Sequence, residues 1–266
     1  MADIPFKLAI KPNDHVKFEI VHEEAEFLVV LKPAGLVTQP GKGHTTDSLL
    51  NGLFARYGKL LQNLGVKRDW GLLHRLDKDT SGLLVIAKMP NAYDQLRRDF
   101  EDRKIDKEYL AIIHGVPKPL QGVVQARLKE VNVPGPEWGT VKKSAISRQG
   151  EEALSTYRVM AHVEGPAHPA AASLVQVKIK TGRLHQIRAH MMFLGTPVWG
   201  DDLYTLPAVA GAAAKSAKVP HPPRLCLHAF RLGFKHPISG KWVHYESPLP
   251  ADLGGFARKL GLLPAG

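Results

Sequence analysis

The residues best suited to chemistry lie in one segment, His74 to Gly82. It packs two carboxylates, three cationic side chains and two hydroxyls into nine residues, directly before a very apolar run. Asp77 and Asp79 share a face if this segment is extended, and paired carboxylates can hydrolyse glycosidic bonds. The alternative is a solvated turn in which Asp79 and Ser81 accept hydrogen bonds from backbone N–H groups. Taken alone, the segment favours the turn.

A second basic cluster runs from Lys178 to His190. If a strand ends near Gly182 and a helix begins there, the helix N-terminus and Arg183 form a seat for an anion. That anion could be a phosphate or a catalytic carboxylate. His185 and His190 are five residues apart, which directs them to different helix faces, so we expect structural histidines and no metal.

The sequence also lacks the signatures of a phosphate-binding loop and of a cysteine-based zinc site. The segment Gly41 to Thr46 lacks the spacing of a phosphate-binding loop, because Gly43 follows Lys42 where a hydroxyl should lie. Cys226 is the only cysteine, which excludes an intrachain disulfide and a cysteine-based zinc site and fits a reducing compartment. We therefore expect neither a cofactor nor a metal.

The net charge indicates a polyanionic partner. Thirty-six Lys and Arg residues against twenty-five Asp and Glu give +11 at pH 7. Such a surplus speeds encounter with nucleic acid, although a basic surface kept for solubility explains it equally well. The N-terminus lacks the features of a signal peptide, and no apolar run approaches the roughly 20 residues of a membrane helix. We expect a soluble cytoplasmic protein with no membrane partner.

The periodicity of apolar residues predicts the elements that position these segments. The pattern favours helices over Thr46–Leu61, capped by Thr46 or Asp47, from Asn91, as the cap, through Phe100, and over Leu184–Leu194, ending at Gly195. It favours strands over Glu26–Leu31, Gly82–Lys88, Tyr109–His114, Thr156–Val163 and Leu174–Lys180, the last with one wet face.

Strands mixed with helices, without regular alternation, predict an α+β fold on a mixed or largely antiparallel sheet flanked by helices. We expect a loose N-terminal arm over 1–17, one catalytic domain over 18–250 and a C-terminal tail over 251–266. Proline and glycine predict loop insertions at 131–143 and 206–223. The alanine run 208–214 could form a short helix, but the flanking prolines favour an insertion.

Six segments, in one order from Phe18 to Pro250, resemble the RluA-type family of pseudouridine synthases. The central match spans Gly71 to Val85 and follows the family's catalytic signature nearly residue for residue. The other matching segments are Lys32–Val37, Lys107–Ala111, Thr181–Arg188, Gly200–Tyr204, and Leu227–Ala229 with His236 and Pro237 after it.

The resemblance implies an isomerase that converts uridine in RNA to pseudouridine without metal or cofactor. It makes Asp77 the essential carboxylate, either as nucleophile or as general base, and Arg183 its paired cation, whose planar fork suits a carboxylate. Tyr109 stacks on the target base and Arg75 fills the space that the flipped base leaves. His74 orders the loop or touches RNA, and Leu227 lines the pocket.

Each role has a plainer alternative. Tyr109 could be an ordinary strand aromatic, Arg75 could pair with Asp79, and Arg183 could bind RNA phosphate. The chain also departs from the family: Leu184 stands where threonine is usual. From the position of the first matching segment, we expect no small N-terminal S4-like RNA-binding domain of the kind found in many relatives.

On family analogy we expect a monomer that acts on structured RNA, with ribosomal RNA of the large subunit first and transfer RNA second. Two rivals remain open: a carboxylate-dependent glycosidic hydrolase, and a non-catalytic RNA-binding protein.

Overall fold

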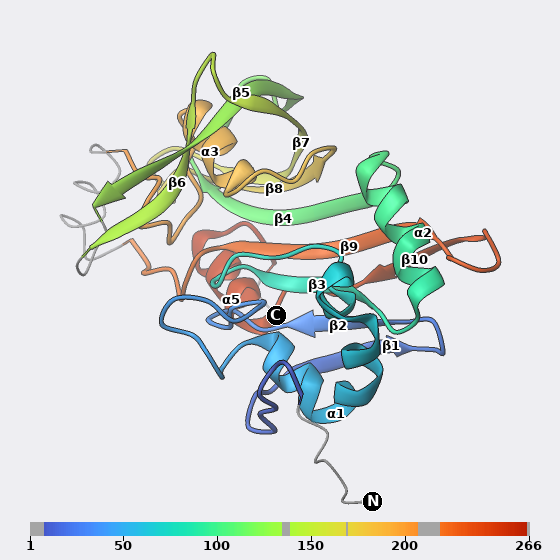
Figure 1. The fold of residues 1–266 in the computed structure, drawn as a ribbon. Helices are drawn as coiled ribbons and strands as arrows, with labels where there is room; N and C mark the ends of the chain where they lie inside the picture. The colour runs from blue at the N-terminus through green and yellow to red at the C-terminus, as the bar shows by residue number, and fades with distance from the viewer. Residues whose placement is uncertain (1–7, 135–138, 169, 207–218, 265–266) are drawn as a thin grey trace, which may run out of the picture. The chain divides into compact units, whose positions relative to one another are not determined.

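The chain divides into two compact units in a computed structural model that describes residues 8–134, 139–168, 170–206 and 219–264 (Figure 1). The first unit consists of residues 1–105 and 232–247, and the second of residues 106–231 and 248–266. Strand β9 contains one boundary between them. The elements are β1 (Glu19–Glu23), β2 (Phe27–Lys32), α1 (Leu49–Leu64), η1 (Val66–Gly71), β3 (Ser81–Ala87), α2 (Pro90–Glu101), β4 (Asp106–His114), β5 (Gln121–Pro134), β6 (Thr140–Ile146), β7 (Glu151–Val163), β8 (Ala172–Ile179), α3 (Gln186–Phe193), β9 (Leu227–Lys235), β10 (Trp242–Glu246) and α5 (Ala251–Leu260).

In the first unit, β2 lies between β1 and β3, with antiparallel pairing on both sides. Five of the six residues of β2 and all seven of β3 are buried, which explains their apolar runs. Side chains of α2, including Tyr93 and Leu96, pack with both strands in one hydrophobic core. The register places Lys32, the last residue of β2, opposite Gly82, where β3 begins. The predicted strands at 26–31 and 82–88 are therefore confirmed to within one residue at each end.

Helix α1 begins two or three residues after the predicted caps. Thr46 and Asp47 do not cap it; Ser48 does, because its hydroxyl accepts the N–H of Asn51 while the Asn51 amide oxygen accepts the N–H of Ser48. Both residues are fully buried. This reciprocal capping box satisfies two backbone donors that would otherwise be unpaired, so it sets where the helix starts.

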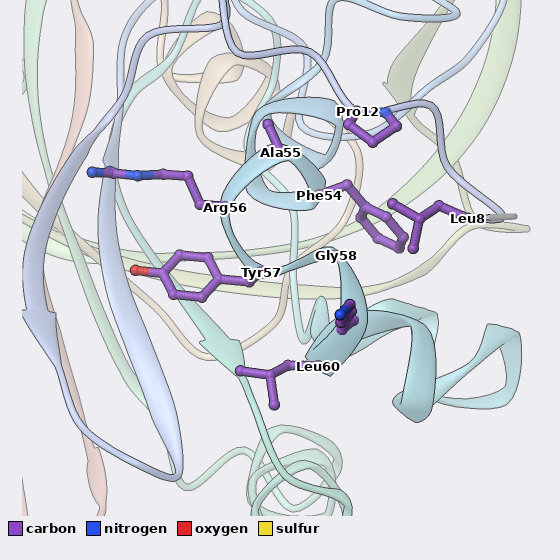
Figure 2. Close-up of a pocket in the computed structure, with 9 residues that line it drawn as sticks. Leu8, Pro12, Phe54, Ala55, Arg56, Tyr57, Gly58 and Leu60 are labelled. Carbon is purple, nitrogen blue, oxygen red and sulfur yellow. The ribbon is translucent and has the colours of Figure 1, made fainter. Parts of the chain in front are cut away.

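Residues 8–17, the described part of the predicted N-terminal arm, are held by contacts to the region of α1. Residues 8–17 contain no helix or strand, but Asn13 donates from its backbone to Asn51 and from its side chain to Thr46. A Cβ on Gly58 would lie 2.9 Å from the side chain of Leu8, so glycine permits this close approach. Figure 2 shows Leu8 and Phe54 at a surface pocket of about 380 Å³, which none of the predicted site residues lines.

The second unit contains a sheet in the order β4-β8-β7-β5-β6, with antiparallel pairing throughout. Strands β5 and β6 form a long hairpin that includes 131–134 and 140–143, so the prediction of a loop over 131–143 is wrong. Residues 135–138 lie outside the described part. Burial over 175–180 alternates as expected for a strand with one wet face, because Val175, Val177 and Ile179 are buried while Gln176 and Lys178 are partly exposed and Lys180 is exposed.

The remaining predictions differ at element ends. Helix α2 begins at Pro90 with Met89 as its N-cap, because proline fits the first helical position; Asn91 already lies inside the helix. Helix α3 begins at Gln186, two residues later than predicted, and ends before Gly195. The residues at 251–260, predicted as a tail, form α5, whose Phe256 packs edge-on against Trp199.

The fold-class prediction is confirmed: helices accompany sheets whose described registers are all antiparallel. The alanine run 208–214 lies outside the described residues, and the rest of 206–223 carries no helix or strand where it is described. Among the described helices, none has the length and apolar character needed to cross a membrane. The domain boundaries at 18 and 250 remain predictions.

Candidate active site

Asp77 lies in an irregular segment of the first unit, between η1 and β3. Its carbonyl accepts the N–H of Thr80 at 3.2 Å, which closes the turn expected from the polar residues. Asp77 is half-buried, while Lys78 and Asp79 are exposed. Leu76 is only 7% exposed, so an apolar anchor immediately precedes the carboxylate.

The two ends of the segment that contains Asp77 are joined by a backbone bridge. Leu72 forms an isolated bridge with Ile86 of β3. Directly before it, Gly71 has φ +88°, and a Cβ there would lie 2.2 Å from the carbonyl oxygen of Ala87. Only glycine tolerates that backbone and that contact. The two ends of the segment, at Leu72 and Ile86, therefore lie side by side.

Two buried side chains, Lys32 at the end of β2 and Thr38 shortly after it, hold the backbone on both sides of Asp77. The Thr38 hydroxyl donates to the Leu76 carbonyl at 2.9 Å and accepts the Leu76 N–H at 3.2 Å. The Lys32 ammonium donates to the carbonyls of Lys78, Pro33 and Leu36 at 3.0, 2.8 and 2.7 Å. Lys32 is fully buried, and an ammonium has three N–H donors to match these three acceptors.

His74 and Arg75 differ in their surroundings. The His74 Nε2 accepts the N–H of Val85 at 3.2 Å, and the ring stacks on Phe100 with centroids 5.0 Å apart. His74 is therefore held by contacts with both β3 and α2. Arg75 is exposed.

Tyr109, Leu227 and Arg183 belong to the second unit. Tyr109 lies in the middle of β4 opposite Val177 of β8 and is 8% exposed. Leu227 is the first residue of β9 and is 3% exposed. Arg183 follows the end of β8, so the sheet places the strand of Tyr109 beside the strand that leads to Arg183.

The turn that carries Arg183 is organised by Gln186. The amide oxygen of Gln186 accepts the Arg183 N–H at 3.1 Å and the Thr181 hydroxyl at 2.7 Å. Its amide nitrogen donates to the Leu154 carbonyl and the Ser155 hydroxyl at 3.1 and 3.0 Å. Gln186 is 3% exposed, so one buried amide joins the turn to β7.

The Arg183 guanidinium itself forms an ion pair with the Glu151 carboxylate and donates to the Glu152 carbonyl at 3.2 Å. Helix α3 begins three residues after Arg183, because His185 has φ +50° and interrupts the helical path. The predicted anion seat at a helix N-terminus near Gly182 is therefore wrong in position.

The other side of this turn rests on a buried ion pair. Arg188 of α3 donates twice to the Asp201 carboxylate, at 2.6 and 2.7 Å. Asp201 also accepts the N–H of Tyr204, whose hydroxyl accepts the N–H of Ser144 at 2.6 Å. The Ser144 hydroxyl in turn donates to the Leu184 carbonyl at 2.5 Å.

Lys107 has no role assigned by the sequence motifs. It lies on β4 two residues before Tyr109, and its Nζ would be 3.4 Å from a Cβ on Gly182. Burial lowers the pKa of Lys107 to about 8. The period of two along a strand puts Lys107 and Tyr109 on one face, which is the signal that could have found it.

The histidines considered as metal ligands have separate partners. His185 Nδ1 lies 3.3 Å from the Tyr204 hydroxyl, and His190 Nδ1 lies 2.9 Å from the Ser155 hydroxyl. Burial lowers the pKa of His190 to about 4.

Among the described residues, Glu24, Glu26 and His236 are the group whose ligand atoms lie close enough for a metal. The His236 Nδ1 accepts two backbone N–H groups, so its neutral ring carries the proton on Nε2, which faces Glu24 at 3.2 Å. That tautomer offers no lone pair to an ion.

A family model described as RNA pseudouridylate synthase matches residues 26–192, more than half of the chain. The chain belongs to this family. It is 37% identical to the ribosomal large subunit pseudouridine synthase D of Zymomonas mobilis, over 91% of this chain and 72% of that protein. It is 33% identical to the uncharacterized RNA pseudouridine synthase YlyB of Bacillus subtilis, over 91% and 72%.

A solved structure titled human RNA pseudouridylate synthase domain containing 4 shares the fold, with TM-score 0.67 and 24% identity, over 93% of this chain and 95% of that one. The resemblance to RluA-type pseudouridine synthases is thus confirmed. This pseudouridine synthase is an isomerase of uridine in RNA. In the reaction the N1–C1′ bond breaks, the base rotates and C5 bonds to C1′, while C5 loses its proton and N1 gains one.

Proposed function

We propose that this pseudouridine synthase modifies ribosomal RNA of the large subunit, with Asp77 as its essential carboxylate. The RNA assignment rests on relatives named ribosomal large subunit pseudouridine synthase D, which are 37% and 36% identical in Zymomonas mobilis and Nitrosomonas europaea. The net charge of +11 supports a polyanionic substrate. The protein acts as a cytoplasmic monomer, through one catalytic domain over residues 18–250.

The observation that carries the role of Asp77 is the way its backbone is held. Hydrogen bonds from Thr38 and Lys32 fix the peptide groups of Leu76 and Lys78, the two neighbours of Asp77. Catalytic groups need such fixed mounts, because a displacement of about 1 Å costs roughly a hundredfold in rate. Asp77 acts as nucleophile or as general base, and both roles require the ionised carboxylate.

Arg183 is the cation that the resemblance assigns to Asp77. Its guanidinium has a planar fork of N–H donors, which matches a carboxylate better than a lysine ammonium does. Its backbone N–H is already bound by Gln186, so its Cα has a fixed place in the second unit. We expect Arg183→Lys to retain part of the activity and Arg183→Met to abolish it.

Four further residues complete the proposal. Tyr109 stacks on the extruded uridine and replaces part of its lost stacking, worth roughly 1–3 kcal/mol. Arg75, which is exposed, fills the space that the flipped base leaves. His74 orders the segment through Val85, and Leu227 lines the base pocket. The isomerisation oxidises nothing and imports no group, so it needs no cofactor.

The test maps pseudouridine in ribosomal and transfer RNA from cells with and without the gene. We expect one or more large-subunit sites to disappear on deletion and to return with the wild-type gene. Asp77→Asn should restore none of them. Asp79→Asn is the matched control, because this exposed carboxylate lies two residues away in the same segment, and it should restore them all.

Three outcomes would contradict the proposal. If the two strains have identical pseudouridine maps, the protein does not modify these RNAs in that cell. If sites are lost only from transfer RNA, the substrate is transfer RNA and not ribosomal RNA. Restoration by Asp77→Asn removes the role of the carboxylate. An incubation of purified enzyme with the RNA separates isomerase from hydrolase, because an isomerase leaves the RNA mass unchanged and a hydrolase releases uracil.

A further inference from the structure

We propose that Thr38 is a positioning residue for catalysis: its hydroxyl fixes the Leu76 peptide groups and so places the Asp77 carboxylate. This inference rests on the proposed role of Asp77. It concerns a residue with no chemistry of its own, 38 positions before Leu76 in the chain.

The Thr38 hydroxyl takes the place of a pairing strand. In a sheet, the N–H and C=O of a residue are paired by a partner strand. At Leu76 one oxygen does both, because it accepts the N–H at 3.2 Å and donates to the C=O at 2.9 Å. Thr38 and Leu76 are 4% and 7% exposed, so water does not readily replace either bond.

Thr38 is itself fixed to a helix. Its carbonyl accepts the N–H of Leu50 at 3.1 Å, and the carbonyl of Val37 accepts the N–H of Leu49 at 2.9 Å. These are the first two residues of α1, whose N–H groups have no partner within the helix. A continuous series of hydrogen bonds therefore leads from the start of α1 through Thr38 to Leu76.

The segment has a second anchor, Lys32, which a substitution of Thr38 leaves intact. Lys32 holds the Lys78 carbonyl at 3.0 Å, and Asp77 holds the Thr80 N–H at 3.2 Å. Both bonds lie after the Asp77 Cα, whereas Thr38 acts before it. Loss of the Thr38 hydroxyl should therefore release the backbone before Asp77 and leave the turn after Asp77 in place.

The expected result separates catalysis from RNA binding. Thr38 is buried and cannot contact RNA, so Thr38→Val should lower kcat at least about tenfold and leave KM within about twofold. Valine keeps the shape of threonine and removes both bonds. Thr38→Ser keeps the hydroxyl, and its kcat should return to within about threefold of the wild-type value.

The experiment uses the full chain and, as substrate, total RNA from cells that lack the gene, with pseudouridine formation measured over time. Thr196→Val is the matched control, because Thr196 is also buried, 6% exposed, and its hydroxyl donates to the Met191 carbonyl at 3.5 Å in the other unit. It should retain wild-type kcat. Hydrogen exchange of a peptide covering residues 73–77 should speed up in Thr38→Val and stay unchanged in the control.

Several results would overturn the inference. They are a kcat for Thr38→Val within twofold of wild type, an effect confined to KM, or a Thr38→Ser enzyme as slow as the valine variant. If Thr38→Val does not fold, Thr38→Cys decides, since its weak thiol donor should give an intermediate kcat and wild-type kcat would refute the role. If wild-type enzyme forms no pseudouridine in this RNA, the proposed substrate fails instead.

Discussion

The segment of Asp77 and the turn of Arg183 are both held by buried polar groups, but of different kinds. A charged ammonium, that of Lys32, binds three backbone carbonyls around the first. A neutral amide, that of Gln186, binds two donors and two acceptors around the second. The first arrangement depends on one ammonium group, while the second belongs to a hydrogen-bond network that ends at a histidine, His190.

The difference teaches that the two regions should respond to different perturbations. Removing the charge of Lys32 leaves carbonyls without donors, and such groups cost about 1–3 kcal/mol each when buried. The network around Gln186 shares its bonds among several side chains, so single losses should be smaller. Acid should affect the Arg183 region first, because His190 in that network is fully buried, whereas His74 beside Asp77 is only partly buried.

The largest effect is expected for Lys32→Met. Methionine fills a similar volume but leaves the carbonyls of Pro33, Leu36 and Lys78 without this donor. We expect the free energy of unfolding, measured by urea denaturation, to fall by about 3 kcal/mol or more. Exposed Lys59→Met is the control and should change it by less than about 0.5 kcal/mol. Equal stability of the two variants would show that the ammonium does not hold the segment.

A smaller loss is expected for Gln186→Leu. The substitution removes an acceptor from Thr181 and Arg183 and a donor from Leu154 and Ser155. We expect about 2 kcal/mol less stability, because the remaining hydroxyl groups can pair in part with one another. Gln149→Leu, at an exposed position, should cost little. A loss larger than that of Lys32→Met would reverse the comparison.

The pH dependence of stability sharpens the same contrast. The pKa of His190 is about 4 in the folded protein, because burial disfavours the cation, against 6.5 for a free imidazole. Its Nε2 is buried without an acceptor among the described residues. Between pH 6.5 and pH 4, His190 is protonated in the unfolded chain but not in the folded chain. The free energy of unfolding therefore falls as the pH drops from 6.5 towards 4.

The measurement compares urea denaturation at pH 7 and pH 5. His190 should contribute roughly 2 kcal/mol to the drop between them, since each pKa unit corresponds to about 1.4 kcal/mol. His190→Gln should show a correspondingly smaller drop, while exposed His221→Gln should match the wild type. His114, with a pKa also lowered to about 4 by burial, keeps the drop above zero in both variants. An unchanged drop in His190→Gln would exclude its role.

The smallest effect is expected for Leu184→Thr, which restores the residue usual in the family. The structure uses the carbonyl of Leu184, which accepts from Ser144, and any side chain retains that carbonyl. We expect stability within about 1 kcal/mol and kcat within about twofold of wild type. Ser144→Ala, which removes the donor, should have the larger effect on both quantities. The reverse order would give the side chain at 184 a role of its own.

Local patterns in the sequence predicted what depends on neighbouring residues. Apolar runs identified β2 and β3 because strands buried on both faces leave no polar position. The hairpin of β5 and β6 was missed, since proline and glycine near its tip outweighed a strand pattern rich in charged, exposed residues. The start of α1 was misplaced because four consecutive residues, 45–48, can cap, and only the reciprocal bond to Asn51 selects Ser48.

The anchors of the candidate site could not be predicted in the same way. Thr38 and Lys32 reach Leu76 and Lys78 across 38 and 46 residues, and spacing along the chain carries no information about such contacts. A signal existed for Lys32, whose charge ends an otherwise apolar buried run. Gln186 lies in the matched arginine segment, but two of its four bonds are to Leu154 and Ser155 of β7, whose first residues the periodicity did not reveal.

The closure of residues 72–86 by Gly71 and the Leu72–Ile86 bridge has a consequence for RNA binding. A loop that is open in the free enzyme loses conformational entropy when its ligand orders it, and that loss weakens association. Here the two ends already meet in the folded chain, so the entropy of closure is lost once, during folding. The free energy of RNA contact is then available to draw a uridine out of its stack.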